Sequence, residues 1–138
     1  MRRVLFDSDV LLDVLAQRQP FLVASAQALN TVTQLQVQGY VSGHAVTNIF
    51  YILRRQVGSE TARQLLSRLL QYLQIASVTD EVIRAALQNA MTDFEDAVTH
   101  EAGNAAGVEI IVTRNTPDFV ASRIPAVLPE EFLAMLED

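Results

Sequence analysis

Residues 108–119, Val-Glu-Ile-Ile-Val-Thr-Arg-Asn-Thr-Pro-Asp-Phe, carry the clearest structural signal in the chain. The run from Val108 to Thr113 is short, mostly apolar and rich in β-branched residues, which is typical of a strand buried on both faces. A polar loop follows, and Asp118 lies five residues after Thr113. Because strands of this kind belong mainly to parallel sheets covered by helices, the segment favours an α/β architecture.

The apolar patterns on either side of this segment predict strands and helices in alternation. Strands are expected at residues 3–6, 40–42, 75–78 and 108–113, with an edge strand at 125–128. Helices are expected at residues 10–15, 21–35, 44–55, 59–73, 80–90, 93–106 and 129–136. Strands that alternate with helices are joined by right-handed crossovers, so the sheet should be mostly parallel. We therefore expect one three-layer α/β/α domain over residues 1–138, with four or five strands.

Length and composition narrow the class of protein. A chain of 138 residues suits a single domain, and the absence of cysteine excludes disulfide frameworks, zinc sites with Cys ligands and a Cys nucleophile. It also fits a reducing, cytoplasmic location. The apolar runs are far shorter than the ~20 residues that span a bilayer, and the opening MRRVLFDSD has no long apolar stretch of an export signal. The expectation is a cytoplasmic protein outside the membrane.

The charge balance gives a mixed signal about nucleic acid. All ten basic residues are arginines, and the net charge of -6 argues at first against a nucleic-acid partner. Six acids, however, fall in three short segments: Asp7, Asp9, Asp93, Glu95, Asp96 and Asp118. Setting them aside leaves ten acids against ten arginines, a balanced surface.

Three of these acids are expected at one edge of the sheet. Asp7 follows the first strand, Asp118 follows the best strand, and Asp96 lies in the first turn of the helix that leads into that strand. Ligands bind outside the carboxyl ends of parallel strands, at a switch point in strand order. Clustered carboxylates need a compensating cation, and oxygen ligands without Cys or clustered His favour Mg²⁺ or Mn²⁺.

Each acid also has a purely structural interpretation. Asp7 can cap the helix that follows it, Asp93 with Asp96 resembles a capping box, and Asp118 suits a turn. Asp13 is interpreted as a solvated helix position.

Other catalytic motifs have little support. The two histidines lack metal-ligand spacing, so His44 is expected to cap or pack and His100 to lie on a helix surface. There is no G-x-S-x-G nucleophile elbow and no P-loop.

Three segments together resemble a PIN domain. They are VLFDSDVLLDVL at residues 4–15, DFEDAVTHEAGNAAGVEIIVTRNTPDF at 93–119 and VLPEEFL at 127–133. Their order and spacing cover nearly the whole chain. The resemblance implies the α/β/α fold expected above and a metal-dependent ribonuclease activity. Many small bacterial members of this family are VapC-like toxins of toxin–antitoxin pairs.

The resemblance also assigns roles by position. The implied metal-binding and catalytic acids are Asp7, Asp96 and Asp118, with Asp93 as a looser match one turn before Asp96. Thr113 and Asn115 match polar residues that shape the pocket. Asp9 and Glu95 are further supporting residues.

One position departs from the family pattern. The family usually carries a Glu on the helix after the second strand, but no acid occurs from Ser42 to Ser59. Asn48 occupies the Glu position, and an amide oxygen ligates a cation without bringing charge. Asp93 or Glu95 is then the source of the missing carboxylate, or metal affinity and turnover are low.

The leading hypothesis is a metal-dependent endoribonuclease that hydrolyses RNA phosphodiesters with metal-activated water. Single-stranded or looped RNA is the expected substrate, and Arg54, Arg55 and Arg114 are candidates for contacts with its backbone. A toxin role implies a cognate antitoxin that covers the acidic pocket. The apolar stripes at 21–35 and 44–53 form either a homodimer face or simply core.

Two other functions stay open from the residues. A PIN-like domain without turnover would bind RNA or a protein partner. A haloacid-dehalogenase-like phosphatase would use Asp7 as nucleophile and Asp9 as general acid, but the chain has no Lys for the basic residue of that mechanism.

Overall fold

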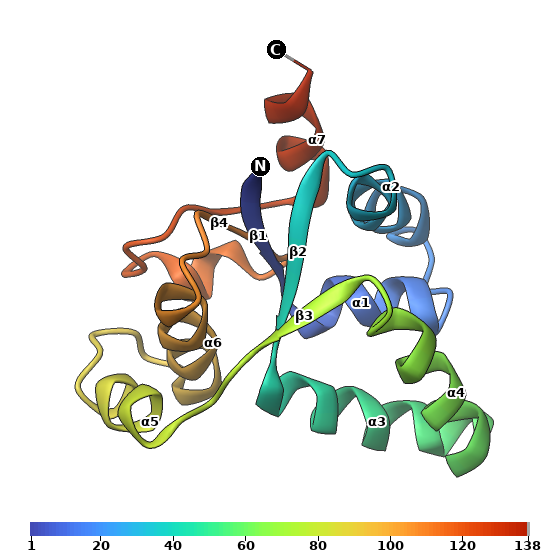
Figure 1. Ribbon diagram of the computed structural model, residues 1–138, viewed down its shortest axis with the longest axis horizontal. Coiled ribbons are helices and arrows are strands. Elements are labelled where there is room, and N and C mark those ends of the chain that lie inside the picture. Colours follow the sequence, from blue (N-terminus) through green and yellow to red (C-terminus); the bar gives the residue numbers. More distant parts are fainter. Residues whose placement is uncertain (138) are drawn as a thin grey trace.

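A computed structural model describes residues 1–137, so only Asp138 of the expected domain lies outside it. Five strands form one sheet in the order β3-β2-β1-β4-β5, and every neighbouring pair is parallel (Figure 1). The strands are β1 (Arg2–Phe6), β2 (Val37–Ser42), β3 (Leu73–Ala76), β4 (Ile110–Val112) and β5 (Ala126–Val127). The expected parallel sheet is confirmed, with the upper of the two strand numbers.

Seven α-helices in the described range cover both faces of this sheet. They are α1 (Ser8–Leu15), α2 (Leu22–Thr33), α3 (Gly43–Val57), α4 (Ser59–Leu69), α5 (Asp80–Leu87), α6 (Phe94–Ala105) and α7 (Pro129–Leu136), and a short 3-10 helix spans Thr116–Phe119. Helices α5 and α6 lie on one side of the sheet, and the other five lie on the opposite side (Figure 1). The three-layer α/β/α architecture is therefore confirmed.

The alternation of side chains along β1 divides the core between the two faces. Val4 and Phe6 pack with α1, α2, α3, α4 and α7, whereas Leu5 packs with α5 and α6. All three side chains are fully buried. Phe6 also meets Phe132 of α7 edge to face, with ring centroids 6.1 Å apart. Asp7 comes directly after Phe6, so this aromatic contact fixes the end of β1 from which Asp7 extends.

Polar side chains and one glycine set the boundaries of these elements. The carboxylate of Asp7 accepts a hydrogen bond from the Ser8 amide at the start of α1, and Asp93 accepts one from the Asp96 amide at the start of α6. Gly39 in β2 sits where a Cβ would lie 2.5 Å from Leu73 Cδ2. It would also lie 2.7 Å from Val32 Cγ2, so a larger residue here would push aside the side chains of Leu73 and Val32.

Several predicted boundaries were wrong. Strand β3 spans Leu73–Ala76 rather than 75–78, since its pairing with β2 begins at Leu73 opposite Gly39. Strand β4 is shorter than the predicted 108–113, and β2 begins three residues earlier than predicted. Helix α5 ends at Leu87 instead of residue 90. Within residues 1–137, no helix is both long and apolar enough to cross a membrane.

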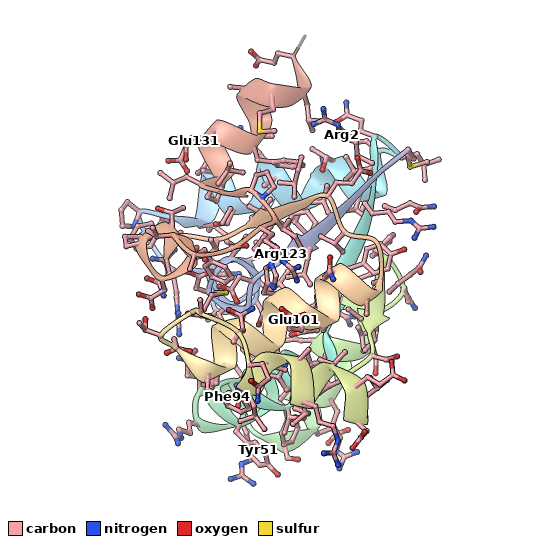
Figure 2. The ribbon with its side chains drawn as sticks, turned by 90° about the vertical axis from the view of Figure 1, so that its left-hand side faces the viewer. Arg2, Tyr51, Phe94, Glu101, Arg123 and Glu131 are labelled. Atoms are coloured by element: carbon pink, nitrogen blue, oxygen red, sulfur yellow. The ribbon has the colours of Figure 1, made fainter. Side chains whose placement is uncertain are left out.

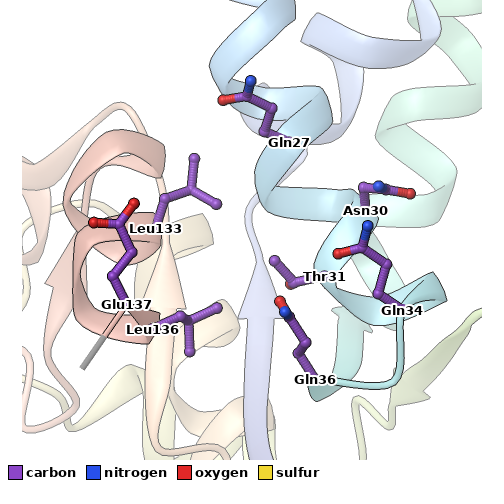
Figure 3. Close-up of a pocket in the computed structure, with 8 residues that line it drawn as sticks. All are labelled: Gln27, Asn30, Thr31, Gln34, Gln36, Leu133, Leu136 and Glu137. Carbon is purple, nitrogen blue, oxygen red and sulfur yellow. The ribbon is translucent and has the colours of Figure 1, made fainter.

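A polar pocket lies between α2 and α7 at the amino ends of the strands. It has a volume of about 390 Å³, and amide side chains from α2 and the segment before β2 face Leu133, Leu136 and Glu137 of α7 across it (Figure 3). The acids singled out from the sequence lie at the opposite, carboxyl edge of the sheet. This pocket is therefore separate from the candidate site described next.

Candidate functional site

The strand order reverses between β1 and β4, and the candidate site lies at the carboxyl ends of these two strands. The chain runs from β1 to β2 and β3 on one side, and returns to β4 and β5 on the other. The backbone amide of Asp7 donates to the carbonyl of Val112 over 2.9 Å, so Asp7 and Thr113 leave neighbouring strands side by side. This is the switch point at which open α/β sheets bind ligands.

Asp7 and Asp9 are held by the turn that follows β4. The Thr113 hydroxyl donates to Asp7 Oδ2 over 2.9 Å, and the Arg114 backbone amide donates to Asp9 Oδ2 over 3.0 Å. Asp7 is buried, and its other carboxylate oxygen caps α1 through the Ser8 amide. The helix-capping interpretation of Asp7 is correct, and it coexists with a place in the acidic site.

Three further acids meet beside this pair. Asp93, Asp96 and Asp118 each offer a carboxylate oxygen, and these oxygens lie within 4.8 Å of one another. Asp93 and Asp96 come from the start of α6, whereas Asp118 comes from the short 3-10 helix after β4. Asn115 Nδ2 donates to Asp118 Oδ2 over 2.6 Å, which fixes the direction of that carboxylate.

Burial, and after it the charge of neighbouring acids, raises the pKa of three carboxyl groups in the site. Burial, followed by the carboxylates of Asp7, Asp93 and Asp118, raises the pKa of Asp96 from 3.8 to about 7. Burial and then the charge of Asp7 raise the pKa of Asp9 from 3.8 to about 6. Burial also raises the pKa of Asp7, although the Thr113 hydrogen bond opposes it. Groups that repel in this way are typical of a site that works with an added positive charge.

The donor set fits a divalent hard cation. Every ionisable side chain of the cluster offers carboxylate oxygens, which Mg²⁺ and Mn²⁺ prefer, and the chain contains no cysteine for a softer metal. A cation among Asp93, Asp96 and Asp118 would favour the charged form of Asp96, whose pKa is raised by burial and then by the neighbouring carboxylates.

Asn48 lies beside Glu95, one of the two acids that the sequence analysis named as a source of the missing carboxylate. Asn48 Nδ2 donates to Glu95 Oε2 over 3.3 Å, across the gap between α3 and α6. His44 Nε2, at the start of α3, lies 3.2 Å from the Glu95 backbone oxygen. Asn48 and Glu95 therefore occupy adjoining positions at the rim of the site.

Two residues were placed wrongly by the sequence analysis. Asp13 is fully buried and binds the Arg114 side chain, so it is not a solvated position. His100 is buried rather than on a helix surface, and its Nδ1 lies 2.8 Å from Glu101 Oε2. The signal for His100 was its spacing, since it follows the buried Ala97 by one helical turn and shares its face.

His100 belongs to a polar cluster on the α5–α6 side of the sheet. Its Nε2 accepts a hydrogen bond from the Arg123 amide over 3.2 Å, which places the ring proton on Nδ1, facing Glu101. Asn89 donates to the same Glu101 oxygen over 2.7 Å. Figure 2 shows Glu101 and Arg123 close together over α6. The cluster ties α6 to the loop that leads to β5.

The three arginines proposed to contact RNA differ in their surroundings. Arg54 and Arg55 are exposed in the last turn of α3. The Arg54 guanidinium lies over the Tyr51 ring, 5.0 Å from its centre. Arg114 uses two of its three guanidinium nitrogens to bind Asp13, which leaves it less free to meet a phosphate.

We expect the stability of the metal-free protein to fall as the pH rises from about 4 to about 7. Asp96 and Asp9 have folded-state pKa values of about 7 and about 6 against 3.8 for the free group, so the folded state holds more protons across this window. Deprotonation therefore favours the unfolded chain. In Asp96→Asn the loss of folding stability between pH 4 and pH 8 should be smaller by on the order of 1 kcal/mol. The difference is this small because Asp96 is half exposed, so that solvent screens its charge.

Urea unfolding at several pH values in EDTA checks this expectation. The wild type and Asp96→Asn should have similar midpoints near pH 4 and separate as the pH rises, with the variant more stable. A difference in unfolding midpoint between the two proteins that stays constant from pH 4 to pH 8 would contradict this expectation.

Comparison with known proteins places this arrangement in a family. A family model described as PIN domain matches residues 3–117. A toxin–antitoxin complex from Klebsiella pneumoniae contains a chain of 22% identity with a TM-score of 0.69, and the match covers 91% of this chain and 97% of that one. No curated protein matches the chain.

Two other solved structures have the same fold at lower identity. VapBC2 from Rickettsia felis, bound to a DNA fragment from its promoter, has 10% identity and a TM-score of 0.70, covering 91% of this chain and 96% of that one. VapC20 from Mycobacterium tuberculosis, described as a toxin that cleaves the sarcin-ricin loop, has 14% identity and a TM-score of 0.63, covering 78% and 86%. These likenesses show the fold. Because the family model spans most of the sequence, the chain belongs to the PIN domain family.

Proposed function

We propose that the protein is a metal-dependent endoribonuclease of the PIN type. The observation that carries this proposal is the meeting of Asp7, Asp96 and Asp118 at one sheet edge, from three segments far apart in the sequence. Burial of Asp96, and after it the charges of the neighbouring carboxylates, raises the pKa of Asp96 to about 7. Such an arrangement is costly for the fold and is explained by a cation that it binds.

The residues of the site divide in this proposal into those that hold the ion and those that orient the carboxylates. A bound Mg²⁺ or Mn²⁺ ion would supply a water of lowered pKa and stabilise charge on the phosphate during in-line hydrolysis. Asp7, Asp96 and Asp118, with Asp93, would hold that ion. Thr113 keeps Asp7 oriented through its hydroxyl, and Asn115 does the same for Asp118.

A protein partner is part of the proposal. Several structures with this fold are toxin–antitoxin complexes, which supports a cognate antitoxin for this chain in the cytoplasm. A homodimer through α2 or α3 is a further proposal. It is supported by Val23 and Tyr51, which are exposed on helices whose opposite faces are buried.

The experiment that tests the proposed activity uses the purified protein and end-labelled single-stranded RNA. Cleavage is expected with Mn²⁺ or Mg²⁺ and should stop in EDTA. A single-stranded DNA of the same sequence controls for general nuclease activity. RNA that stays intact over a wide range of protein and Mn²⁺ concentrations would contradict the endoribonuclease proposal.

One observation favours a second candidate function. No acid occurs from Ser42 to Ser59, and we assign Asn48 to the position where the family pattern carries a Glu, which gives the site one charge fewer there. A PIN domain that binds RNA or a protein without cleaving it fits this loss. Saturable RNA binding in Mn²⁺ without cleavage would identify this function. Membership of the PIN family replaces the haloacid-dehalogenase-like interpretation of Asp7 and Asp9.

We expect the double substitution Arg54→Gln/Arg55→Gln to raise KM for RNA several-fold with little change in kcat. Both arginines are exposed on α3, whose first half borders the acids through Asn48. A plot of log binding affinity against log salt concentration should become shallower by about 1.4 in slope, because two phosphate contacts are lost. Arg2→Gln is the matched control, because Arg2 is exposed at the opposite end of β1. An unchanged KM and salt slope would remove both arginines from the interface.

A further inference from the structure

An ion pair between α1 and the turn after β4 lies just outside the acidic site. Arg114 Nε donates to Asp13 Oδ2 over 2.7 Å, and its Nη2 donates to Asp13 Oδ1 over 2.9 Å. Asp13 is 0% exposed, while the Arg114 side chain is 25% exposed. A two-point contact of this kind fixes the plane of the guanidinium as well as its position.

Both members of this pair are held by α2. Ser25 Oγ donates to Asp13 Oδ2 over 2.8 Å, and the Phe21 ring lies against the Arg114 guanidinium with its centre 3.7 Å from Cζ. Arg114 is therefore confined between a carboxylate and an aromatic face. A surface ion pair such as Arg84–Asp80, with both side chains about three-quarters exposed, has no such support.

Residues 113–115, around Arg114, contact three acids of the candidate site through one backbone amide and two side chains. Thr113 donates its hydroxyl to Asp7, Arg114 donates its amide to Asp9, and Asn115 donates its side-chain amide to Asp118. The backbone amide of Asn115 also donates to Thr113 Oγ1 over 3.0 Å, which links the two ends of the turn. Three successive residues thus set the directions of three carboxylates.

We propose that Asp13 and Arg114 form a positioning pair that locks residues 113–115, so that Asp7 and Asp118 stay beside Asp96 and Asp9 stays beside Asp7. The pair itself touches neither a reacting atom nor a metal. It acts through the turn, because fixing the Arg114 side chain against α1 and α2 fixes the backbone on either side of it. The inference deepens the proposed function, and its relevance to catalysis rests on that function.

The primary test measures the order of this turn in the metal-free protein. We expect the backbone ¹⁵N order parameters of residues 113–116 and 118 to fall from about 0.85 to below about 0.7 in Asp13→Asn and in Arg114→Lys. Arg114→Lys keeps the charge but loses the two-point contact, so it tests geometry in a variant with little reason to unfold. Asp80→Asn, which breaks the exposed Arg84–Asp80 pair, is the matched control and should leave these values unchanged.

A second measurement separates positioning from simple stabilisation. Calorimetric titration with Mn²⁺ at a temperature where each variant is fully folded should show at least threefold weaker binding in both Asp13→Asn and Arg114→Lys. The double variant should be no worse than the weaker single variant, since the two residues act as one unit. A pair that only stabilises the fold would lower the unfolding midpoint and leave Mn²⁺ affinity intact.

The outcomes distinguish this inference from the proposed function. Order parameters at residues 113–116 and 118 that match the wild type in Arg114→Lys would overturn the positioning pair, whatever the protein does with metal. If the turn loses order in the two variants while the wild-type protein binds no Mn²⁺, the positioning pair is supported and the metal-dependent nuclease is contradicted instead.

Discussion

RNA cleavage should fall at least about 100-fold in Asp7→Asn and in Asp96→Asn, with the fold intact in both. Each substitution removes a charge from the cluster in which a cation is proposed to bind. Asn is as good a helix cap as Asp, so Asp7→Asn can still accept the hydrogen bond from the Ser8 amide that begins α1. In Asp7→Asn the side chain has one acceptor oxygen in place of two, so the Thr113 hydroxyl that donates to Asp7 Oδ2 must turn to accept from the new NH₂ group.

Cleavage rates and Mn²⁺ titrations of both variants check this result. Circular dichroism and a melting curve in EDTA establish that the fold is kept, and Asp80→Asn serves as a control at an exposed carboxylate. In EDTA at pH 8, Asp96→Asn should melt above the wild type, because a repelled charge is gone. A nuclease that keeps its rate in both variants would place the chemistry elsewhere.

Asn48→Glu should tighten Mn²⁺ binding about tenfold, which corresponds to about 1.4 kcal/mol. The substitution adds a carboxylate beside Glu95, which in the wild type accepts a hydrogen bond from the Asn48 side chain. In the metal-free protein the two carboxylates repel each other, so the unfolding midpoint should drop. The shift in melting temperature on adding Mn²⁺ should therefore be larger than in the wild type.

Asn48→Gln is the control for this change, since it lengthens the side chain without adding charge. If RNA cleavage rises together with Mn²⁺ affinity in Asn48→Glu only, the uncharged residue limits the natural activity. An affinity equal to that of the wild type would indicate that Glu95 already supplies the carboxylate expected at this position.

The general location of the site could be predicted because parallel sheets follow simple rules. Asp7 and Asp118 come after strands, and the carboxyl ends of parallel strands share one edge. Asp96 follows from the same logic, since its helix leads into β4. Helix-capping and metal-site interpretations of Asp7 competed in the sequence, and the structure gives it the cap while placing it beside the other acids.

The supporting contacts could not be predicted in this way. Asp13 was misjudged because its partner Arg114 lies 101 residues away, and no local pattern along α1 reveals that distance. The register of β3 was missed by two residues for a similar reason. Ile75 looks like a core residue but is half exposed, since the pairing with β2 and the crowding at Gly39 decide which side chains point inward.

The pairing of β1 with β4 also sets the time at which the site can exist during synthesis. Residues 4–6 must wait for residues 110–112 before that half of the sheet closes, and Asp118 emerges later still. A ribosome that has made residues 1–109 has produced Asp7, Asp93 and Asp96, but not Thr113, Asn115 or Asp118. Closing so long a loop is a late and slow event in folding. The growing chain therefore carries no complete acidic centre until residue 118 has been made and β4 has paired with β1.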